Sequence, residues 1–147
     1  MQKVTPFLWF DGKAEEAARF YASVFKKGKV GKPMPGPDGK VLAVPFEIEG
    51  QQFTALNGGP QFRFNESVSF VVHCKDQKEV DYFWDKLVSG GGQESMCGWL
   101  KDRYGLSWQV VPDVLFELLR GKKAAKVMEA FMQMRKFDIA ALKQAAA

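Results

Sequence analysis

Histidine and cysteine, which often act as metal ligands, general bases or nucleophiles, are few in this chain. Its only histidine is His73, and its only cysteines are Cys74 and Cys97. These counts exclude a three-histidine zinc site and a two-histidine facial triad. No nucleophile-elbow sequence supports a Ser-His-Asp triad. His73 could reach a pocket, or it could be a partly exposed, hydrogen-bonded residue at the end of a strand.

Cys97 precedes Gly98 and Trp99 and follows a glycine-rich segment. It could be a reactive thiol at the mouth of a pocket. Free cysteine is, however, among the most buried side chains, and the sequence shows no cationic partner for it. We therefore interpret Cys97 as a small buried filler. Lys101 and Asp102 are neighbours in a predicted strand and so face opposite sides, which argues against a paired role.

Two tryptophans could form the floor of an apolar ligand site. Trp9 and Trp99 both lie in predicted strands, and core packing and pocket lining are equally open for them. Asn57 stands where a strand ends, so it could line a pocket or cap its own turn. Trp84 and Trp108 are predicted to be core, because an internal repeat matches them with aromatic residues of the first half.

The composition is that of an ordinary globular protein with a mild excess of positive charge. The 147 residues carry a net charge of +4, and the lysines gather over residues 26–32 and 122–126. No aromatic side chains alternate with these lysines, so we expect solvated faces and no nucleic-acid partner. No stretch has the length of a transmembrane helix or the form of a signal peptide. We therefore expect no membrane partner, a cytoplasmic location and two free thiols.

An internal repeat places these residues on a common framework. Phe7–Phe10 is followed by an amphipathic run, and sixty-three residues later Phe70–His73 is followed by a run with the same apolar spacing. A second match pairs Phe53 with Trp108 at an offset of 55, so the first repeat has an eight-residue longer loop between its helix and its hairpin. Each repeat is predicted to contain a strand, a helix and further strands.

Turn and cap residues set the limits of the expected elements. Glu15 after Gly12 predicts a capping box, as does Glu79 after Asp76. Pro45 argues for an edge strand or a bulge. Strands are expected at 4–10, 41–48, 51–56, 68–74, 98–102 and 106–111, with a loop over 26–40 and helices ending near 25 and 89 and covering 113–119, 122–134 and 138–146. The last helices need an apolar partner, either their own sheet or a second subunit.

Several short segments carry a family resemblance. They are Thr5–Phe10 with Ala14–Ala17 and Phe20-Tyr21, Thr54–Pro60, Cys97–Trp99, Tyr104–Gln109, and Met128–Ala130 through Lys136–Ala140. With them the whole chain resembles the vicinal oxygen chelate superfamily of glyoxalase I, extradiol dioxygenases and bleomycin-resistance proteins. Within it, the chain resembles the PhnB-like group labelled 3-demethylubiquinone-9 3-methyltransferase, and the tail resembles that group's C-terminal extension.

The resemblance implies an α+β fold in a single domain, 1–147. Two βαβββ repeats, 1–60 and 61–112, would form a curved mixed sheet of glyoxalase/bleomycin-resistance-like half-barrels. Helices would cover the convex face, and residues 113–147 would form a C-terminal helical extension. The resemblance also implies a homodimer and a pocket in the concave sheet.

Metal enzymes of the superfamily place four ligands on the concave face. Matching by repeat, these positions fall near Pro6, Thr54, Ser69 and Gln109, and none is His, Glu or Asp. We therefore predict no catalytic metal and no cofactor. Gln109 could contribute to the pocket or tie the sheet together, and His73 shares the face of Ser69.

Two functions from different classes remain open. One is a metal-free module binding a small, partly apolar or aromatic molecule. The other is an enzyme, either with a weak divalent-metal site of lyase or dioxygenase type or with the methyltransferase activity of the group's label. A dimer without a ligand is the third reading. No glycine-rich strand-to-helix loop supports a nucleotide cofactor. The candidate ligand-binding residues are Trp9, Thr54, Asn57, Ser69, His73, Trp99 and Gln109.

Overall fold

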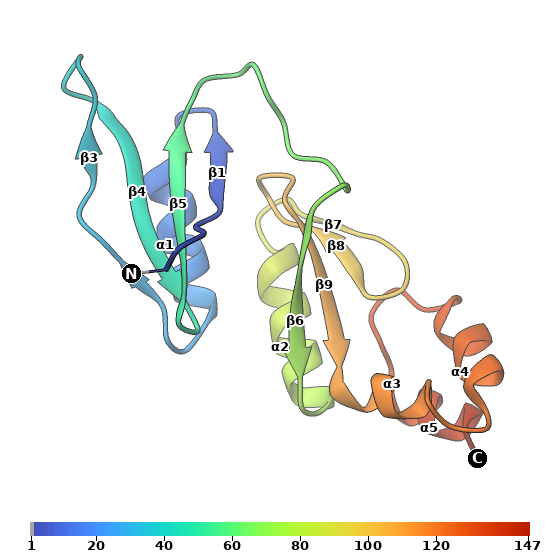
Figure 1. Cartoon of the computed structure of the whole chain (residues 1–147). Helices are drawn as coiled ribbons and strands as arrows, with labels where there is room; N and C mark the ends of the chain where they lie inside the picture. Colours follow the sequence, from blue (N-terminus) through green and yellow to red (C-terminus); the bar gives the residue numbers. More distant parts are fainter. Residues whose placement is uncertain (1) are drawn as a thin grey trace. The chain divides into compact units, whose positions relative to one another are not determined.

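The chain forms two compact units that divide between Phe64 and Asn65 (Figure 1). The computed structural model describes residues 2–147. Each unit has its own mixed sheet with a helix against one face, and neither sheet closes into a barrel within the described residues. The mixed α+β class with two separate sheets confirms the predicted fold class.

The first unit is a sheet with one long helix. Its order is β1-β5-β4-β2, with β3 also pairing with β4, and β1 runs parallel to β5. Tyr21 of the helix stacks on Phe46, which stacks on Phe53 at ring-centroid distances of 5.7 and 5.2 Å. The elements are β1 (Phe7–Phe10), α1 (Ala14–Val24), β2 (Lys29–Val30), β3 (Met34–Pro35), β4 (Val41–Ile48) and β5 (Gln51–Asn57).

The loop predicted over residues 26–40 contains two short strands, and these explain Pro45. β2 and β3 pair with different parts of β4, and Pro45 lies between those two stretches. The Pro45 carbonyl accepts from the Gly31 N–H at 2.7 Å, so the backbone of Pro45 faces β2 and β3. Pro45 has no N–H to donate, and on this side it meets the break between the two short strands. An interior strand accommodates the proline because its neighbour is interrupted there.

The start of α1 differs from the predicted capping box. Lys13 is the N-cap and makes no side-chain capping bond. Asn57, at the end of β5, accepts from the Ala14 N–H at 2.8 Å and donates to the Val41 carbonyl at 3.1 Å. The helix is therefore capped by a residue 43 positions away, which the local sequence pattern around Glu15 could not reveal.

The second unit repeats the arrangement and adds three short helices. Its sheet order is β6-β9-β8-β7, with β6 parallel to β9 and α2 against one face. Asp76 caps α2 by accepting from the Glu79 N–H at 2.9 Å, as predicted. The elements are β6 (Ser69–Cys74), α2 (Gln77–Val88), β7 (Gln93–Glu94), β8 (Trp99–Lys101), β9 (Ser107–Pro112), α3 (Asp113–Leu118), α4 (Ala124–Phe131) and α5 (Ile139–Ala145).

The offset of 63 holds for the helices but not for the first strands of the repeats. In β1 the helix-facing residues are Leu8 and Phe10, whereas in β6 they are Val72 and Cys74, which gives an offset of 64. Three residues connect β1 to α1 and only two connect β6 to α2. A shift of one residue moves every side chain to the other face, so Trp9 corresponds to His73 and not to Val72.

The C-terminal extension packs on its own unit. The Met134 and Arg135 carbonyls accept from the N–H groups of Cys97 and Gly98 at 2.7 and 2.8 Å. Phe137 is almost completely buried and lies against Gly98, where an added Cβ would come within 2.3 Å of its ring. The last helices therefore pack within their own unit, where α4 and α5 contact each other and α5 contacts α3. In residues 2–147, no helix has both the length and the apolar character needed to cross a membrane.

Candidate functional site

Each sheet has one face against a helix and one open face, and the register defines the open face of the second unit. Residues paired across strands share a face, so Lys101 and Ser107 lie on the same side, as do Trp99 and Gln109. Leu100 and Trp108, on the other side, are buried. On β6, β8 and β9, the side chains of the open face are therefore those at odd-numbered positions.

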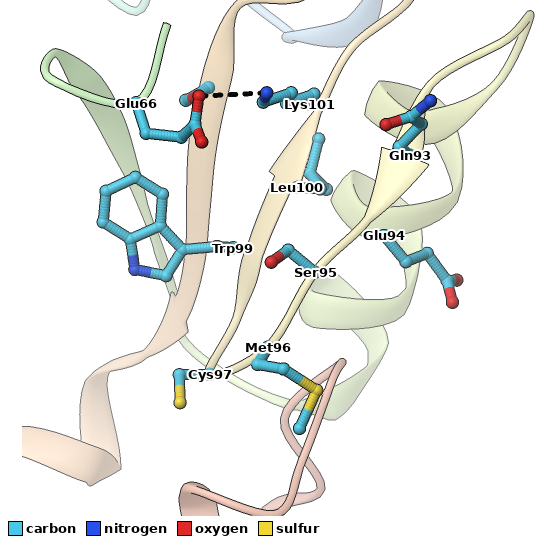
Figure 2. Close-up of a pocket in the computed structure, with 10 residues that line it drawn as sticks. Glu66, Gln93, Glu94, Ser95, Met96, Cys97, Trp99, Leu100 and Lys101 are labelled. Carbon is cyan, nitrogen blue, oxygen red and sulfur yellow. Dashed lines mark ion pairs between the residues drawn. The ribbon is translucent and has the colours of Figure 1, made fainter.

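A hollow of about 470 Å³ opens on this face of the second unit (Figure 2). Its volume is in the range of small-molecule sites. The lining combines an aromatic ring, an amide, a hydroxyl and an ion pair on neighbouring strands. The residues that matter for its chemistry are Glu66, Gln93, Cys97, Trp99, Lys101 and Ser107.

Ser107 is an unusual member of this lining. The residue is completely buried, and its hydroxyl makes no hydrogen bond to any described residue. Leaving a buried hydroxyl without a partner costs about 1–3 kcal/mol. Such a group at the edge of a hollow is what a binding site for a polar ligand atom requires.

Lys101 and Glu66 form the charged part of the hollow. The Lys101 Nζ lies 2.9 Å from Glu66 Oε1. The dashed line in Figure 2 marks this ion pair. This hydrogen bond and the positive charge of Lys101 lower the pKa of the Glu66 carboxyl. Asp102 points to the opposite side, where it accepts from the Trp108 indole N–H at 2.9 Å. The expected separation of Lys101 and Asp102 is therefore confirmed, but Lys101 has a different ionic partner.

The first unit has a hollow of similar volume at the equivalent register. Its hollow of about 460 Å³ is lined by Lys29, Glu47, Gln52 and Thr54, among others. Glu47 pairs with Gln52 as Lys101 pairs with Ser107. Duplication has thus produced two hollows with different side chains. In the first unit the described residues leave no hydroxyl buried without a partner.

The positions that the resemblance marks for metal ligands carry hydroxyl or amide side chains. Gln109 donates to the Ser69 Oγ at 2.9 Å, so these two side chains bind each other. In the first unit, the corrected offset of 64 replaces Pro6 by Thr5, which lines the hollow with Thr54. Hydroxyl and amide groups alone do not fit a catalytic divalent metal. No group of three or more His, Cys, Asp or Glu residues is suitably placed within residues 2–147.

Two candidates of the first unit have structural roles. Asn57 lies on the helix side, where both ends of its amide are engaged by α1 and β4. The Trp9 indole N–H donates to the Gly59 carbonyl at 2.8 Å, and its ring meets Phe62 edge-on at 4.8 Å. An added Cβ on Gly58 would come within 2.3 Å of the Trp9 ring. Trp9 therefore holds the Asn-Gly-Gly-Pro segment in place, on the open face of its sheet.

His73 and the cysteines stand apart from the polar end of the hollow. His73 is exposed, 3.7 Å from Asp113, with its ring near Phe116. Cys74 is buried on the helix side. Burial, assisted by nearby carboxylates, raises the pKa of its thiol to about 12. Both thiols are free, and Cys97 lines the hollow half-buried, with the left-handed φ of 59°.

Of the candidate ligand-binding residues, only Trp99 lines the second-unit hollow, and six polar lining residues were missed. They come from a turn, a loop and three strands, and they are Glu66, Gln93, Glu94, Ser95, Lys101 and Ser107. Trp99 and Lys101 are two residues apart in one predicted strand, so they share a face. This spacing could have identified Lys101 as a residue beside Trp99. No local pattern identifies Ser107, because its missing hydrogen bond is a property of the folded unit.

Comparison with known proteins gives the family. Residues 2–111 match the model of the family described as 3-demethylubiquinone-9 3-methyltransferase. A putative 3-demethylubiquinone-9 3-methyltransferase, the PhnB protein of Bacillus cereus, is 32% identical with a TM-score of 0.69, covering 76% of this chain and 99% of its own. No curated protein matches.

Two more distant structures share the fold. The protein PA1353 of Pseudomonas aeruginosa is 18% identical with a TM-score of 0.61, covering 76% of this chain and 98% of its own. The fosfomycin resistance protein FosX of Listeria monocytogenes is 14% identical with a TM-score of 0.60, covering 80% and 96%. The family model ends before α3, so the extension lies outside it. The chain belongs to the PhnB-like 3-demethylubiquinone-9 3-methyltransferase family of the vicinal oxygen chelate superfamily.

Proposed function

We propose that this protein binds a small, partly aromatic molecule in the hollow on the open sheet face of its second unit. The observation that carries this proposal is the buried Ser107 hydroxyl, which lines the hollow without a hydrogen-bond partner. A ligand atom would supply that partner. Trp99 offers an apolar surface beside it, and Gln93 offers a further polar group.

The test is a titration with a set of small aromatic compounds, followed by amide chemical shifts. Binding in the hollow should shift the amides of β7, β8 and β9, and Ser107→Ala should weaken it. Ser23→Ala is the matched control, because Ser23 lies on α1 and its hydroxyl donates to the Phe20 carbonyl. Shifts confined to other elements, or equal effects of the two variants, would contradict the proposal.

The second part of the proposal is that binding needs no catalytic metal. It rests on the donor types at Thr5, Thr54, Ser69 and Gln109, of which the last two are engaged with each other. Metal analysis of protein purified without added metal should give no stoichiometric divalent ion. A tightly bound divalent ion would contradict metal-free binding and favour the lyase or dioxygenase alternative.

The alternative function is the methyltransferase activity in the family's description. The family match is the observation that favours it. The N-terminus of each long helix is, however, engaged by a protein side chain, Asn57 for α1 and Asp76 for α2. The strand-to-helix turns therefore offer no free cradle for a nucleotide cofactor. Thermal stabilisation by S-adenosyl methionine would revive this alternative.

We also propose a homodimer in the cytoplasm. Exposed apolar side chains on the open faces, such as Phe7 and Val71, support association, and the two free cysteines support a reducing compartment. Light scattering should give about twice the monomer mass of 16.5 kDa. A monomer across the working concentration range would defeat the dimer.

A further inference from the structure

The charge arrangement in the second-unit hollow indicates which kind of ligand it takes. Among the described lining residues, Lys101 alone carries a positive charge. Its partner Glu66 stands in the turn before β6, and the Glu66 side chain is 65% exposed. An ion pair this exposed contributes little stability, so Glu66 can leave Lys101 at small cost.

Ser107 lies directly beside this ion pair in the sheet. It is the register partner of Lys101 on one side and of Ser69 on the other. Ser107 lies on the open face, but its hydroxyl is inaccessible to solvent and has no hydrogen-bond partner among the described residues. Side chains over Ser107 must therefore move before a ligand reaches it, and Lys101 is the adjacent one.

We propose that the Glu66 carboxylate occupies the place of a ligand's anionic group, and that the hollow binds a small aromatic monocarboxylate by exchange with Glu66. The ligand carboxylate would accept from the Lys101 ammonium group and the Ser107 hydroxyl, and its ring would lie against Trp99. This inference rests on the proposed function, since it names the ligand class of the same site.

The exchange keeps the charge at Lys101 balanced. The other carboxylate of the lining, Glu94, is engaged elsewhere, because it accepts from the Trp84 indole N–H at 2.8 Å and lies 3.8 Å from Arg135. One carboxylate replaces another at Lys101, so no additional unpaired charge is created in the hollow, and Glu66 returns to water. Ser107 gains the acceptor that it lacks. A neutral aromatic molecule that displaced Glu66 would leave the Lys101 ammonium group without a counter-charge, and a cationic molecule would be repelled by Lys101.

The experiment compares benzoate and benzamide binding to the wild-type chain and to Glu66→Gln, by calorimetry and amide shifts. Removing the internal competitor should tighten benzoate binding about two- to fivefold. Benzamide binding should be the same for both proteins. Glu129→Gln is the matched control, because Glu129 is exposed on α4 and undergoes the same charge change far along the chain.

Two further variants locate the carboxylate. Lys101→Met should abolish benzoate binding, and Ser107→Ala should weaken it about tenfold, since a hydrogen bond to a charged group is lost. Unchanged or weaker benzoate binding by Glu66→Gln would overturn the inference. If benzamide shifts β7–β9 and benzoate does not, the anion inference fails while the proposed function stands. If benzoate does not bind but another compound of the aromatic set shifts β7–β9, the anion inference alone fails, and if no compound of the set binds, both fail.

Discussion

At the scale of single residues, Ser107 lowers the stability of the second unit but offers a hydrogen-bonding group to a ligand. Ser107 is buried without a hydrogen-bond partner on the open face, whereas the neighbouring pair Ser69 and Gln109 satisfy each other. Structural polar residues are expected to be paired when buried. An unpaired one beside a hollow is therefore better explained by a ligand than by the fold.

Ser107→Ala should stabilise the ligand-free protein by about 1 kcal/mol, because it removes a hydroxyl whose desolvation nothing offsets. Urea denaturation of the wild-type chain and the variant measures this difference. The same variant should bind aromatic ligands less well. Ser23→Ala replaces a local hydrogen bond on a helix surface by a residue of higher helix propensity, and it should change stability by no more than about 0.5 kcal/mol. Destabilisation by Ser107→Ala would show that the hydroxyl has a partner in solution.

Cys74 gives a prediction for alkaline pH. Burial and nearby carboxylates raise the pKa of its thiol to about 12, so the folded chain keeps the proton that the unfolded chain releases near pH 9. Stability should therefore fall as pH rises above 9, by at most about 1.4 kcal/mol per pH unit. Cys74→Ala should lack this slope when both proteins are unfolded by urea between pH 8 and 10.5. Parallel pH profiles would contradict the shifted pKa.

At the scale of elements, connections decide which side chains meet. The turn before α2 is one residue shorter than the turn before α1, and this single difference reverses the strand alignment while leaving the helix alignment intact. Helix faces repeat every 3.6 residues and tolerate small shifts, but strand faces alternate at every residue. The sequence offset was therefore right for α1 and α2 and wrong for β1 and β6.

The Asn57 cap on α1 should contribute more to the stability of the protein than a local side-chain hydrogen bond in a turn. Asn57→Ala removes the acceptor of the Ala14 N–H and the donor to the Val41 carbonyl, and it should cost about 2 kcal/mol. Asn65→Ala is the control, because Asn65 only accepts from Ser67, two residues away in its own exposed turn. Equal denaturation midpoints for these two variants would remove the capping role from Asn57.

At the scale of the whole molecule, the extension after β9 is integrated into the second unit. Phe137 fills the space beside Gly98, Lys136 pairs with Asp81 at 2.9 Å, and Gln77 exchanges hydrogen bonds with the Phe137 carbonyl and the Ile139 N–H. The Lys136 side chain lowers the pKa of Asp81, after the larger effect of the Gln77 amide. The extension thus fixes the start of β8, which borders the hollow.

Phe137→Ala should therefore destabilise the second unit by about 3–5 kcal/mol, through lost burial and the cavity left behind. Hydrogen exchange should accelerate first at the Cys97 and Gly98 amides, whose acceptors belong to the extension. Phe116→Ala, at an exposed phenylalanine on α3, should leave both measurements near wild type. Unchanged exchange at Cys97 in Phe137→Ala would show that the extension does not hold this corner.

The sequence by itself determined the duplication, the faces of the two long helices and the Asp76 cap. Each follows from residue types and from periodicities that act within about one turn or one strand. Only the tertiary structure decided the Asn57 cap, the break that accommodates Pro45, the register of β1 and the Lys101–Glu66–Ser107 arrangement. These depend on which distant backbone groups meet, and hydrogen-bond satisfaction across elements leaves no trace in the local sequence pattern.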